Sequence, residues 1–142
     1  MSELESPYIT APIEESDTKS GFSCGKRPLD DYFARHAFPN HMGDIGRAYV
    51  LRKEPGAAAE LPTVLGFYTL NMALVESAQV APLTANKLPR YPMPAALIGR
   101  LAVDQRAHGR RLGEQLLMDA LRRVDAAKLV AHHHRRQQRH GF

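Results

Sequence analysis

A turn rich in glycine and arginine, HGRRLG at residues 108–113, is the part of this sequence whose residue types could do chemistry. Backbone N–H groups at the start of a helix have no partner within the helix and lie at its positive end, so such a turn can bind an anion. Gly109 allows the backbone to approach a ligand closely. Three nearby arginines attract phosphate: Arg106, Arg110 and Arg111. The spacing alone predicts either a phosphate site or an ordinary strand-to-helix turn with solvated arginines.

Two elements must position that turn. Residues 95–104, AALIGRLAVD, form a mostly apolar run that is typical of a strand covered on both faces. From Leu112 to about Lys128, the sequence predicts an amphipathic helix that packs on the sheet. Its apolar stripe consists of Leu112, Leu116, Leu117, Ala120, Leu121, Val124 and Ala127. Residues 129–131, LVA, are apolar enough to start a further strand.

Before this run, the sequence predicts an edge strand, a helix and a break. The edge strand lies within residues 6–15, SPYITAPIEE, which has a short β-branched core. A helix is predicted over about 28–37, because Pro28 suits a first helical position and apolar residues follow at helical spacing. Residues 39–46, PNHMGDIG, are predicted to break or redirect that helix.

The middle of the chain predicts two strands and two loops. RAYVLRK at 47–53 is a strand, and EPGAAAELP at 54–62 is a loop. TVLGFYTLNMALVES at 63–77 predicts a long strand that is bent or bulged near Gly66 or Asn71. Residues 81–94 contain four prolines and predict a connecting loop.

Composition favours one compact domain in a reducing compartment. The chain has 142 residues, of which 44% are hydrophobic, and this is enough for a single core. No stretch reaches the length of a membrane span, and the acidic start does not resemble a signal peptide, so we expect a cytoplasmic protein. The single cysteine, Cys24, cannot form an internal disulfide. Residues 129–142 contribute three arginines and no acid to the net charge of +4, so a polyanion partner can be argued only from local clusters and not from the overall charge.

The turn resembles the acetyl-CoA-binding motif of the GNAT N-acetyltransferase superfamily. LAV at 101–103 matches the strand end, and HGRRLG lies where QGRGLG is typical. The likeness narrows to the GNAT-type toxins of bacterial toxin–antitoxin pairs. Three further stretches carry it in order: FSCGKRPLDDYFARHA at 22–37, GFYTLNMALVES at 66–77 and LPRYPMPAALIGRLAVD at 88–104. The resemblance covers about residues 8–125 and implies the α/β (α+β) GNAT fold, a mixed central sheet flanked by helices, with its C-terminal strands truncated.

The resemblance also implies a ligand, a reaction and partners. Backbone groups of Leu101 and Val103 would pair with the pantetheine arm of the cosubstrate acetyl-CoA, and the turn would hold its pyrophosphate. The full cofactor-binding set is Leu101, Ala102, Val103, His108, Gly109, Arg110, Arg111, Leu112, Gly113 and Glu114. Toxins of this family transfer acetyl to the amino group of an aminoacyl-tRNA, which blocks translation. We expect a ribbon-helix-helix antitoxin and a homodimer as partners, and no membrane.

A tRNA substrate calls for cations that face phosphate. The candidates are Lys26, Arg27, Lys53, Arg90 and Arg100, each of which is alternatively a solvated surface charge. Tyr32 and Phe33 are predicted as core residues rather than as a stacking platform for bases.

Two positions of the turn depart from the family pattern. His108 replaces the usual Gln or Arg, and Arg111 replaces the middle glycine. If that position requires a positive φ, Arg111 costs on the order of 1 kcal/mol. Alternatively, Arg111 keeps its N–H on the phosphate and turns its guanidinium toward the same ligand.

The family's expected general acid is a tyrosine in a later FYxxxGF segment, and no tyrosine follows Tyr91 here. No catalytic residue is therefore assigned. A frameshift or truncation near residues 124–130 would explain the missing tyrosine. We therefore expect an acetyltransferase domain over residues 1–130 and a basic tail over residues 131–142. The alternative to an active transferase is a catalytically impaired remnant that binds CoA or an antitoxin. A third interpretation is a nucleic-acid-binding protein built on the basic tail.

Two other features invite chemical interpretations that we set aside. Consecutive histidines at 132–134 would point to opposite faces of a strand with no Cys or carboxylate nearby, so no metal site is predicted. Cys24 is predicted as a small buried thiol at the entry to a helix, because direct attack by an amine needs no acyl-enzyme.

Overall fold

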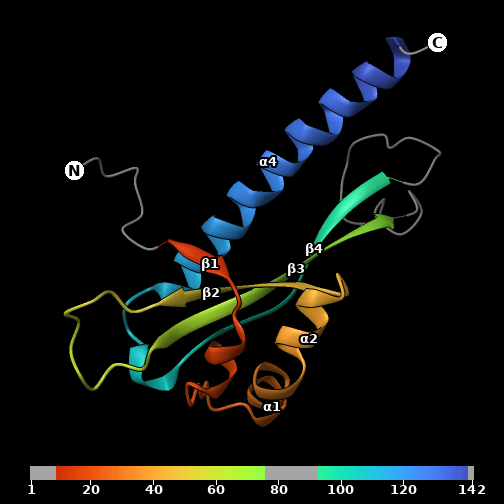
Figure 1. The fold of residues 1–142 in the computed structure, drawn as a ribbon. Helices are drawn as coiled ribbons and strands as arrows, with labels where there is room; N and C mark the ends of the chain where they lie inside the picture. Colours follow the sequence, from red (N-terminus) through yellow and green to blue (C-terminus); the bar gives the residue numbers. More distant parts are fainter. Residues whose placement is uncertain (1–8, 76–92, 141–142) are drawn as a thin grey trace, which may run out of the picture.

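The computed structural model describes residues 9–75 and 93–140, with side chains for 9–72 and 95–126. Four strands form one sheet in the order β1-β2-β3-β4, and every neighbouring pair is antiparallel. Helices α1 and α2 lie on one face of this sheet and α4 on the other (Figure 1). The elements in chain order are β1 Thr10–Pro12, η1 Glu15–Lys19, α1 Arg27–Arg35, α2 Ala37–Met42, β2 Arg47–Arg52, β3 Val64–Val75, β4 Met93–Val103, η3 Gln105–Ala107 and α4 Leu112–His140.

Two apolar clusters make the three layers, because each sheet face is covered by a separate set of helices. The cluster under α1 and α2 is largely aromatic and centres on Phe33 and Phe67, with Tyr32 also buried, as the sequence predicted. The cluster under α4 joins Leu112 and Leu116 to residues of β2 and β3. Alternation along β3 serves both clusters, since consecutive side chains of a strand point to opposite faces.

The predicted helix at 28–37 is confirmed as α1, and the chain is redirected after it as predicted, but residues 39–42 belong to a second helix. This second helix, α2, begins directly after His36 and contains Pro39. Pro39 is the third residue of α2, where a backbone N–H has no partner within the helix, so the missing donor costs nothing. The chain then turns at Gly43 into β2.

The predicted strands at 47–53 and 63–77 are confirmed as β2 and β3, while residues 76–77 lie outside the described residues. The expected irregularity at Gly66 is present, because the β2–β3 register shifts between Leu51 and Arg52, opposite this part of β3. A second shift lies between Thr69 and Leu70, where Gly99 of β4 is the extra residue.

Strand β4 differs from its prediction in two ways. It is the last strand of the sheet among the described residues, and Leu97, Gly99 and Arg100 are exposed, so it is not covered on both faces. The apolar composition was misleading because α4 packs on only one side. The predicted loop at 81–94 is wrong for Met93 and Pro94, which belong to β4, and residues 81–92 lie outside the described residues.

Helix α4 is longer than predicted. It runs from Leu112 to His140, so the strand considered at residues 129–131 is wrong. The predicted boundary at residue 130 falls inside this helix and stays a prediction. Figure 1 shows that only the first part of α4 lies over the sheet, while the rest extends beyond it. Within the described ranges, no helix is long and apolar enough to cross a membrane.

Candidate active site at the turn between β4 and α4

The structure brings the predicted cofactor-binding residues together in one continuous path. β4 ends at Val103, the short η3 follows, and His108 leads into the turn that opens α4. The side chains of Ala102 and Leu112 are buried in the core, so these two residues offer only backbone groups to a ligand. Glu114 is exposed in the first turn of α4, where a carboxylate favours the positive end of the helix.

The turn combines two residues with positive φ. Gly109 has φ +86° and Arg111 has φ +57°. Arg111 therefore adopts the positive φ that was considered for this position, and it carries a strain of about 1 kcal/mol. No heavy atom lies within 4 Å of a Cβ built on Gly109 or Gly113, so both positions face open space. The turn therefore leaves room for a ligand beside its backbone.

The outer edge of β4 faces the same region. The N–H of Asp104 donates to the carbonyl of Leu65 in β3 at 2.9 Å. Because backbone groups of successive residues in a strand point to opposite edges, those of Val103 and Leu101 point away from β3. In agreement, the carbonyl of Val103 lies 3.1 Å from Nε2 of His108. The two residues expected to pair with a pantetheine arm thus present their polar backbone groups outward.

A carboxylate that the sequence analysis missed lies at the root of the turn. Asp104 is fully buried and accepts hydrogen bonds from the N–H of Ser23 and from the backbone and guanidinium of Arg106. Burial raises the pKa of Asp104, but the bonds from Arg106 and Ser23 outweigh it and hold the pKa below its usual value. The sequence signal was a lone acid after an apolar strand, which does not identify its partner 81 residues away.

A second missed cluster fastens α4 to the sheet. Asp119 accepts from the hydroxyls of Thr10 and Tyr68, the latter at 2.6 Å, and pairs with Arg123. Arg123 also donates to the carbonyl of Thr10 and lies over the ring of Tyr49 at 3.9 Å. Burial and the neighbouring carboxylate raise the pKa of Tyr68, so its hydroxyl stays a donor. The spacing of Asp119 and Arg123 on one helix predicts an ion pair, but nothing in the sequence predicts its partners on β1 and β3.

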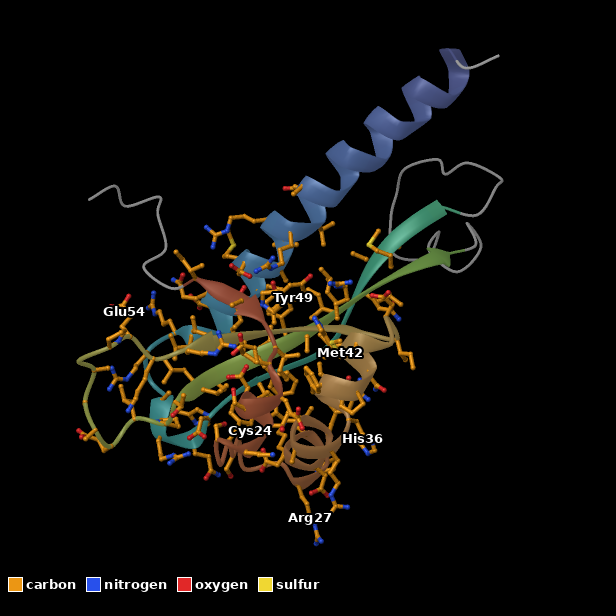
Figure 2. All side chains as sticks on the ribbon, in the orientation of Figure 1. Cys24, Arg27, His36, Met42, Tyr49 and Glu54 are labelled. Atoms are coloured by element: carbon orange, nitrogen blue, oxygen red, sulfur yellow. The ribbon has the colours of Figure 1, made fainter. Side chains whose placement is uncertain are left out.

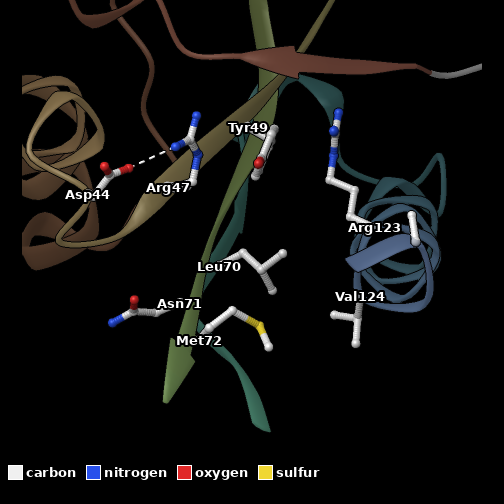
Figure 3. A pocket seen from close by; sticks show the side chains of 9 residues that line it. Asp44, Arg47, Tyr49, Leu70, Asn71, Met72, Arg123 and Val124 are labelled. Atoms are coloured by element: carbon white, nitrogen blue, oxygen red, sulfur yellow. Dashed lines mark hydrogen bonds and ion pairs between the residues drawn. The ribbon is translucent and has the colours of Figure 1, made fainter. Parts of the chain in front are cut away.

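A groove of about 460 Å³ lies beside this cluster, between α4 and the strands β2 and β3 (Figure 3). Its lining consists of Asp44, Arg47, Tyr49, Leu70, Asn71, Met72, Arg123, Val124 and Ala126. Arg47 pairs with Asp44 at 2.7 Å, and Arg123 is held as described above. Both guanidiniums therefore already have partners.

The candidate cations for tRNA are spread over the molecule. Arg100 is exposed on β4 and its guanidinium lies 3.6 Å from the ring centroid of Tyr32. Lys26 and Arg27 lie at the start of α1, where Arg27 is solvated and contacts Asp31 at 3.8 Å (Figure 2). Lys53 bonds the carbonyl of Leu61 across the base of the loop that follows β2. Arg90 lies outside the described residues.

Cys24 and the histidine run complete the predicted residues. Cys24 is partly buried just before α1, and burial raises the pKa of its thiol, which disfavours the nucleophilic thiolate (Figure 2). Residues 132–134 lie on α4 rather than on a strand, in a part whose side chains are not described. Among the described residues, no three His, Cys, Asp or Glu side chains form a metal-binding group.

The fold and this turn define an acyltransferase of the GNAT class. No protein-family model matches the chain, but individual relatives and solved structures agree with this class. A tRNA-acetylating toxin of Mycobacterium tuberculosis is 35% identical over 119 residues, which cover 83% of this chain and 67% of that protein. The probable toxin TacT of Sinorhizobium fredii is 31% identical over 118 residues, covering 82% of this chain and 62% of the relative. This chain thus spans about two thirds of the length of the curated relatives.

Solved structures extend the likeness to the fold. The structure of AtaT complexed with acetyl-methionyl-tRNAfMet has a TM-score of 0.71 at 26% identity, over 87% of this chain and 72% of that one. The structure of AtaTR bound with acetyl-CoA has a TM-score of 0.67 at 27% identity, over 87% and 71% of the two chains. The predicted GNAT fold and the family resemblance are confirmed. The chain belongs to the family of GNAT-type tRNA-acetylating toxins, which are acetyltransferases.

Proposed function

We propose that this chain transfers the acetyl group of acetyl-CoA to the amino group of an aminoacyl-tRNA and thereby blocks translation. The observation that carries the proposal is the positive-φ turn from Gly109 to Arg111 at the start of α4, beside the outward backbone edge of β4. The relatives' names support it, since they describe a tRNA-acetylating toxin, and AtaT was solved with acetyl-methionyl-tRNAfMet.

The turn and the edge of β4 bind different parts of acetyl-CoA. The amides from Gly109 to Gly113 hold the pyrophosphate at the positive end of α4. Backbone groups of Leu101 and Val103 bind the pantetheine arm as an added strand, and the Val103 N–H polarises the thioester carbonyl. His108, Arg110 and Arg111 flank the phosphates. In the described residues, Arg110 and Arg111 have no acidic partner, so both are free to face an anion.

The transfer itself asks little of the side chains. The amine nitrogen attacks the thioester carbon, the carbon–sulfur bond breaks with its electrons on sulfur so that CoA leaves as the thiolate, and the proton lost by the amine passes to solvent water. The α-amino group has an ordinary pKa of about 7.7–8.0 and is therefore partly neutral near pH 7 to 8, so orientation by binding supplies most of the catalysis. A catalytic side chain remains unassigned in this chain.

Exposed cations recognise the tRNA. Arg100 is the strongest candidate, because its guanidinium is fixed over the Tyr32 ring while staying exposed on the same strand as the pantetheine edge. Lys26 and Arg27 add positive charge at the start of α1. Phosphate contacts of this kind position a nucleic acid without reading its sequence.

The proposal extends to partners, location and domain organisation. The chain works in the cytoplasm as a homodimer and is neutralised by a ribbon-helix-helix antitoxin. A toxin–antitoxin assembly is supported by a solved structure of AtaT, in which this toxin is bound to the C-terminus of the antitoxin AtaR. The AtaT chain is 26% identical to this chain over the matched part. Residues 1–130 form the acetyltransferase domain, and residues 131–142 add a basic extension at the end of α4.

Transfer of labelled acetyl tests the proposal. Purified chain is incubated with labelled acetyl-CoA and charged tRNA, and label in the precipitated RNA is counted. We expect label on charged tRNA and none on deacylated tRNA, because the acceptor is the amino group of the esterified amino acid. Arg100→Ala should raise the KM for tRNA while leaving the affinity for acetyl-CoA unchanged. Binding of acetyl-CoA without any transfer would favour the catalytically impaired remnant instead.

A further inference from the structure

The loop from Gly21 to Lys26 is tied to the residues that lead into the acetyl-CoA turn. Oδ2 of Asp104 accepts from the N–H of Ser23 at 2.9 Å, and the N–H of Gln105 donates to the carbonyl of Ser23 at 2.9 Å. Arg106 reaches in the other direction, since its Nη2 donates to the carbonyl of Gly21 at 3.1 Å. We call these contacts between Gly21–Gly25 and Asp104–Arg106 the clasp.

The clasp is closely packed as well as hydrogen-bonded. Gly25 has φ +90°, and a Cβ built on it would overlap the side-chain amide of Gln105. A Cβ at this position would be strained by the positive φ and would force the Gln105 side chain to move away from the loop. The side chain of Asp30, in the first turn of α1, fixes the loop from behind by accepting from the N–H of Cys24 at 2.8 Å. The loop is thus held between α1 and the residues that follow β4.

The clasp controls the direction of the turn. Asp104 caps η3 by accepting from the N–H of Arg106, and the N–H of Ala107 donates back to the carbonyl of Asp104 at 2.9 Å. Only Ala107 and His108 separate the clasp from Gly109, the first of the amides proposed to hold the pyrophosphate. A shift at residues 104–106 is therefore passed to those amides through a short, hydrogen-bonded segment.

We propose that the clasp is a positioning device for acetyl-CoA, with Asp104 and Gly25 as its positioning residues. The inference rests on the proposed function, because it concerns the same cofactor turn. Neither residue touches the reacting atoms. The clasp sets where the turn amides point, and anion binding by backbone amides depends on that geometry because hydrogen bonds weaken steeply when misaligned. A purely structural staple would lower the melting temperature without a specific loss of acetyl-CoA affinity.

Substitution at Gly25 separates these two roles. Gly25→Ala inserts a methyl group against Gln105, and we expect the Kd for acetyl-CoA, measured by isothermal titration, to rise about ten-fold or more. Gly56→Ala is the matched control, since Gly56 has φ +86° with no heavy atom within 4 Å of its built Cβ. It carries the same backbone strain without a contact to Gln105, and its Kd should stay within about two-fold of wild type.

Rescue identifies the contact as the cause. The double variant Gly25→Ala/Gln105→Ala removes the side chain that the new methyl group would meet, and its Kd should return to within about three-fold of wild type. All titrations are made at a temperature where circular dichroism shows every variant folded. Equal Kd values for wild type and Gly25→Ala, or a double variant no better than the single one, would overturn the clasp.

A second pair of variants covers the case in which Gly25→Ala does not fold. Asp104→Asn keeps the shape of the side chain but removes its charge and one acceptor oxygen. We expect acetyl-CoA to bind at least ten-fold more weakly, because a loss of this size corresponds to about one hydrogen bond to a charged group. Its control is Asp17→Asn, because Asp17 is also buried and pairs bidentately with Arg52, away from the turn. Equal losses of affinity in both variants would overturn the proposal.

The outcomes also separate this inference from the function on which it rests. If wild type binds no acetyl-CoA, the proposed function fails and the clasp fails with it. If wild type binds and transfers acetyl while the Gly25 and Asp104 variants bind equally well, only the clasp is wrong.

Discussion

The face of the sheet under α1 and α2 is packed with aromatic rings, whereas the face under α4 carries a partly buried network of hydrogen bonds beside its apolar cluster. On the first face, the Phe33 and Phe67 centroids lie 4.7 Å apart and Phe22 joins them. On the second, Asp119 and Arg123 tie α4 to β1 and β3. Ring packing tolerates small shifts, but hydrogen bonds are directional. Helix α4, which begins at the turn over residues 108–113, is therefore held in a more exact position on the sheet than α1 and α2 are.

Removing a ring from the aromatic face should have the largest effect on stability. Phe67→Ala deletes a fully buried side chain that contacts Phe22 and Phe33, and we expect the free energy of unfolding to fall by about 3–5 kcal/mol. Denaturant unfolding measures it. Phe67→Leu, which keeps most of the apolar volume, should cost less than half as much. A loss below that of the Asp119 variant would contradict the assignment of stability to this face.

Breaking the polar network should cost less stability and move α4. Asp119→Ala leaves the Tyr68 hydroxyl and the Arg123 guanidinium without their shared acceptor, at about 2–3 kcal/mol. Asp125→Ala on the exposed side of the same helix is the control and should change stability by less than about 0.5 kcal/mol. We also expect faster amide exchange at the start of α4 in the Asp119 variant only. Unchanged exchange there would show that the network does not fix the helix.

Acid should loosen the α2–β2 junction. Burial, with a smaller contribution from Arg47, lowers the pKa of His41 from its ordinary 6.5, and its Nδ1 accepts from the N–H of Ala48 at 2.9 Å. Because the folded state favours the neutral ring, its stabilisation is complete above pH 6.5 and declines as the pH falls below that value. The melting temperature of wild type should therefore fall by a few degrees between neutral pH and pH 5. His41→Asn should show a smaller fall, and an equal one would exclude His41 as the cause.

The smallest effect should come from relieving the strained turn. Arg111→Gly removes the cost of φ +57° on a side chain but makes the unfolded chain more flexible, so the net gain should be below about 1 kcal/mol. Asp44→Gly is the control, because Asp44 has a similar φ of +56° but aspartate tolerates this conformation better than arginine. The variant also loses the ion pair between Asp44 and Arg47. Asp44→Gly should thus give no gain in thermal unfolding. A loss of stability in Arg111→Gly would show that the Arg111 side chain contributes more than its strain costs.

Local patterns predicted the elements that depend on local chemistry. The amphipathic stripe from Leu112 and the proline at the start of α1 predicted their helices, and the Gly/Arg turn predicted a candidate site whose role in binding stays a prediction. Predictions failed where long-range packing decided the outcome. Pro39 is compatible with a helix because of its place in the first turn, and β4 lies at the edge of the described sheet despite its apolar sequence. Asp104 and Asp119 could not be assigned because their partners lie 81 and 109 residues away along the chain.

The cofactor turn gives the most direct test of the account. Acetyl-CoA is titrated calorimetrically into the full chain, with Gly109→Val as the variant that places a branched side chain at φ +86° beside the amides proposed to hold the pyrophosphate. We predict one site per chain with a micromolar Kd in wild type and a loss of at least about 1.4 kcal/mol of binding free energy, or ten-fold, in the variant. No binding in wild type at up to about 1 mM acetyl-CoA would contradict the central claim that this turn holds the acyl donor.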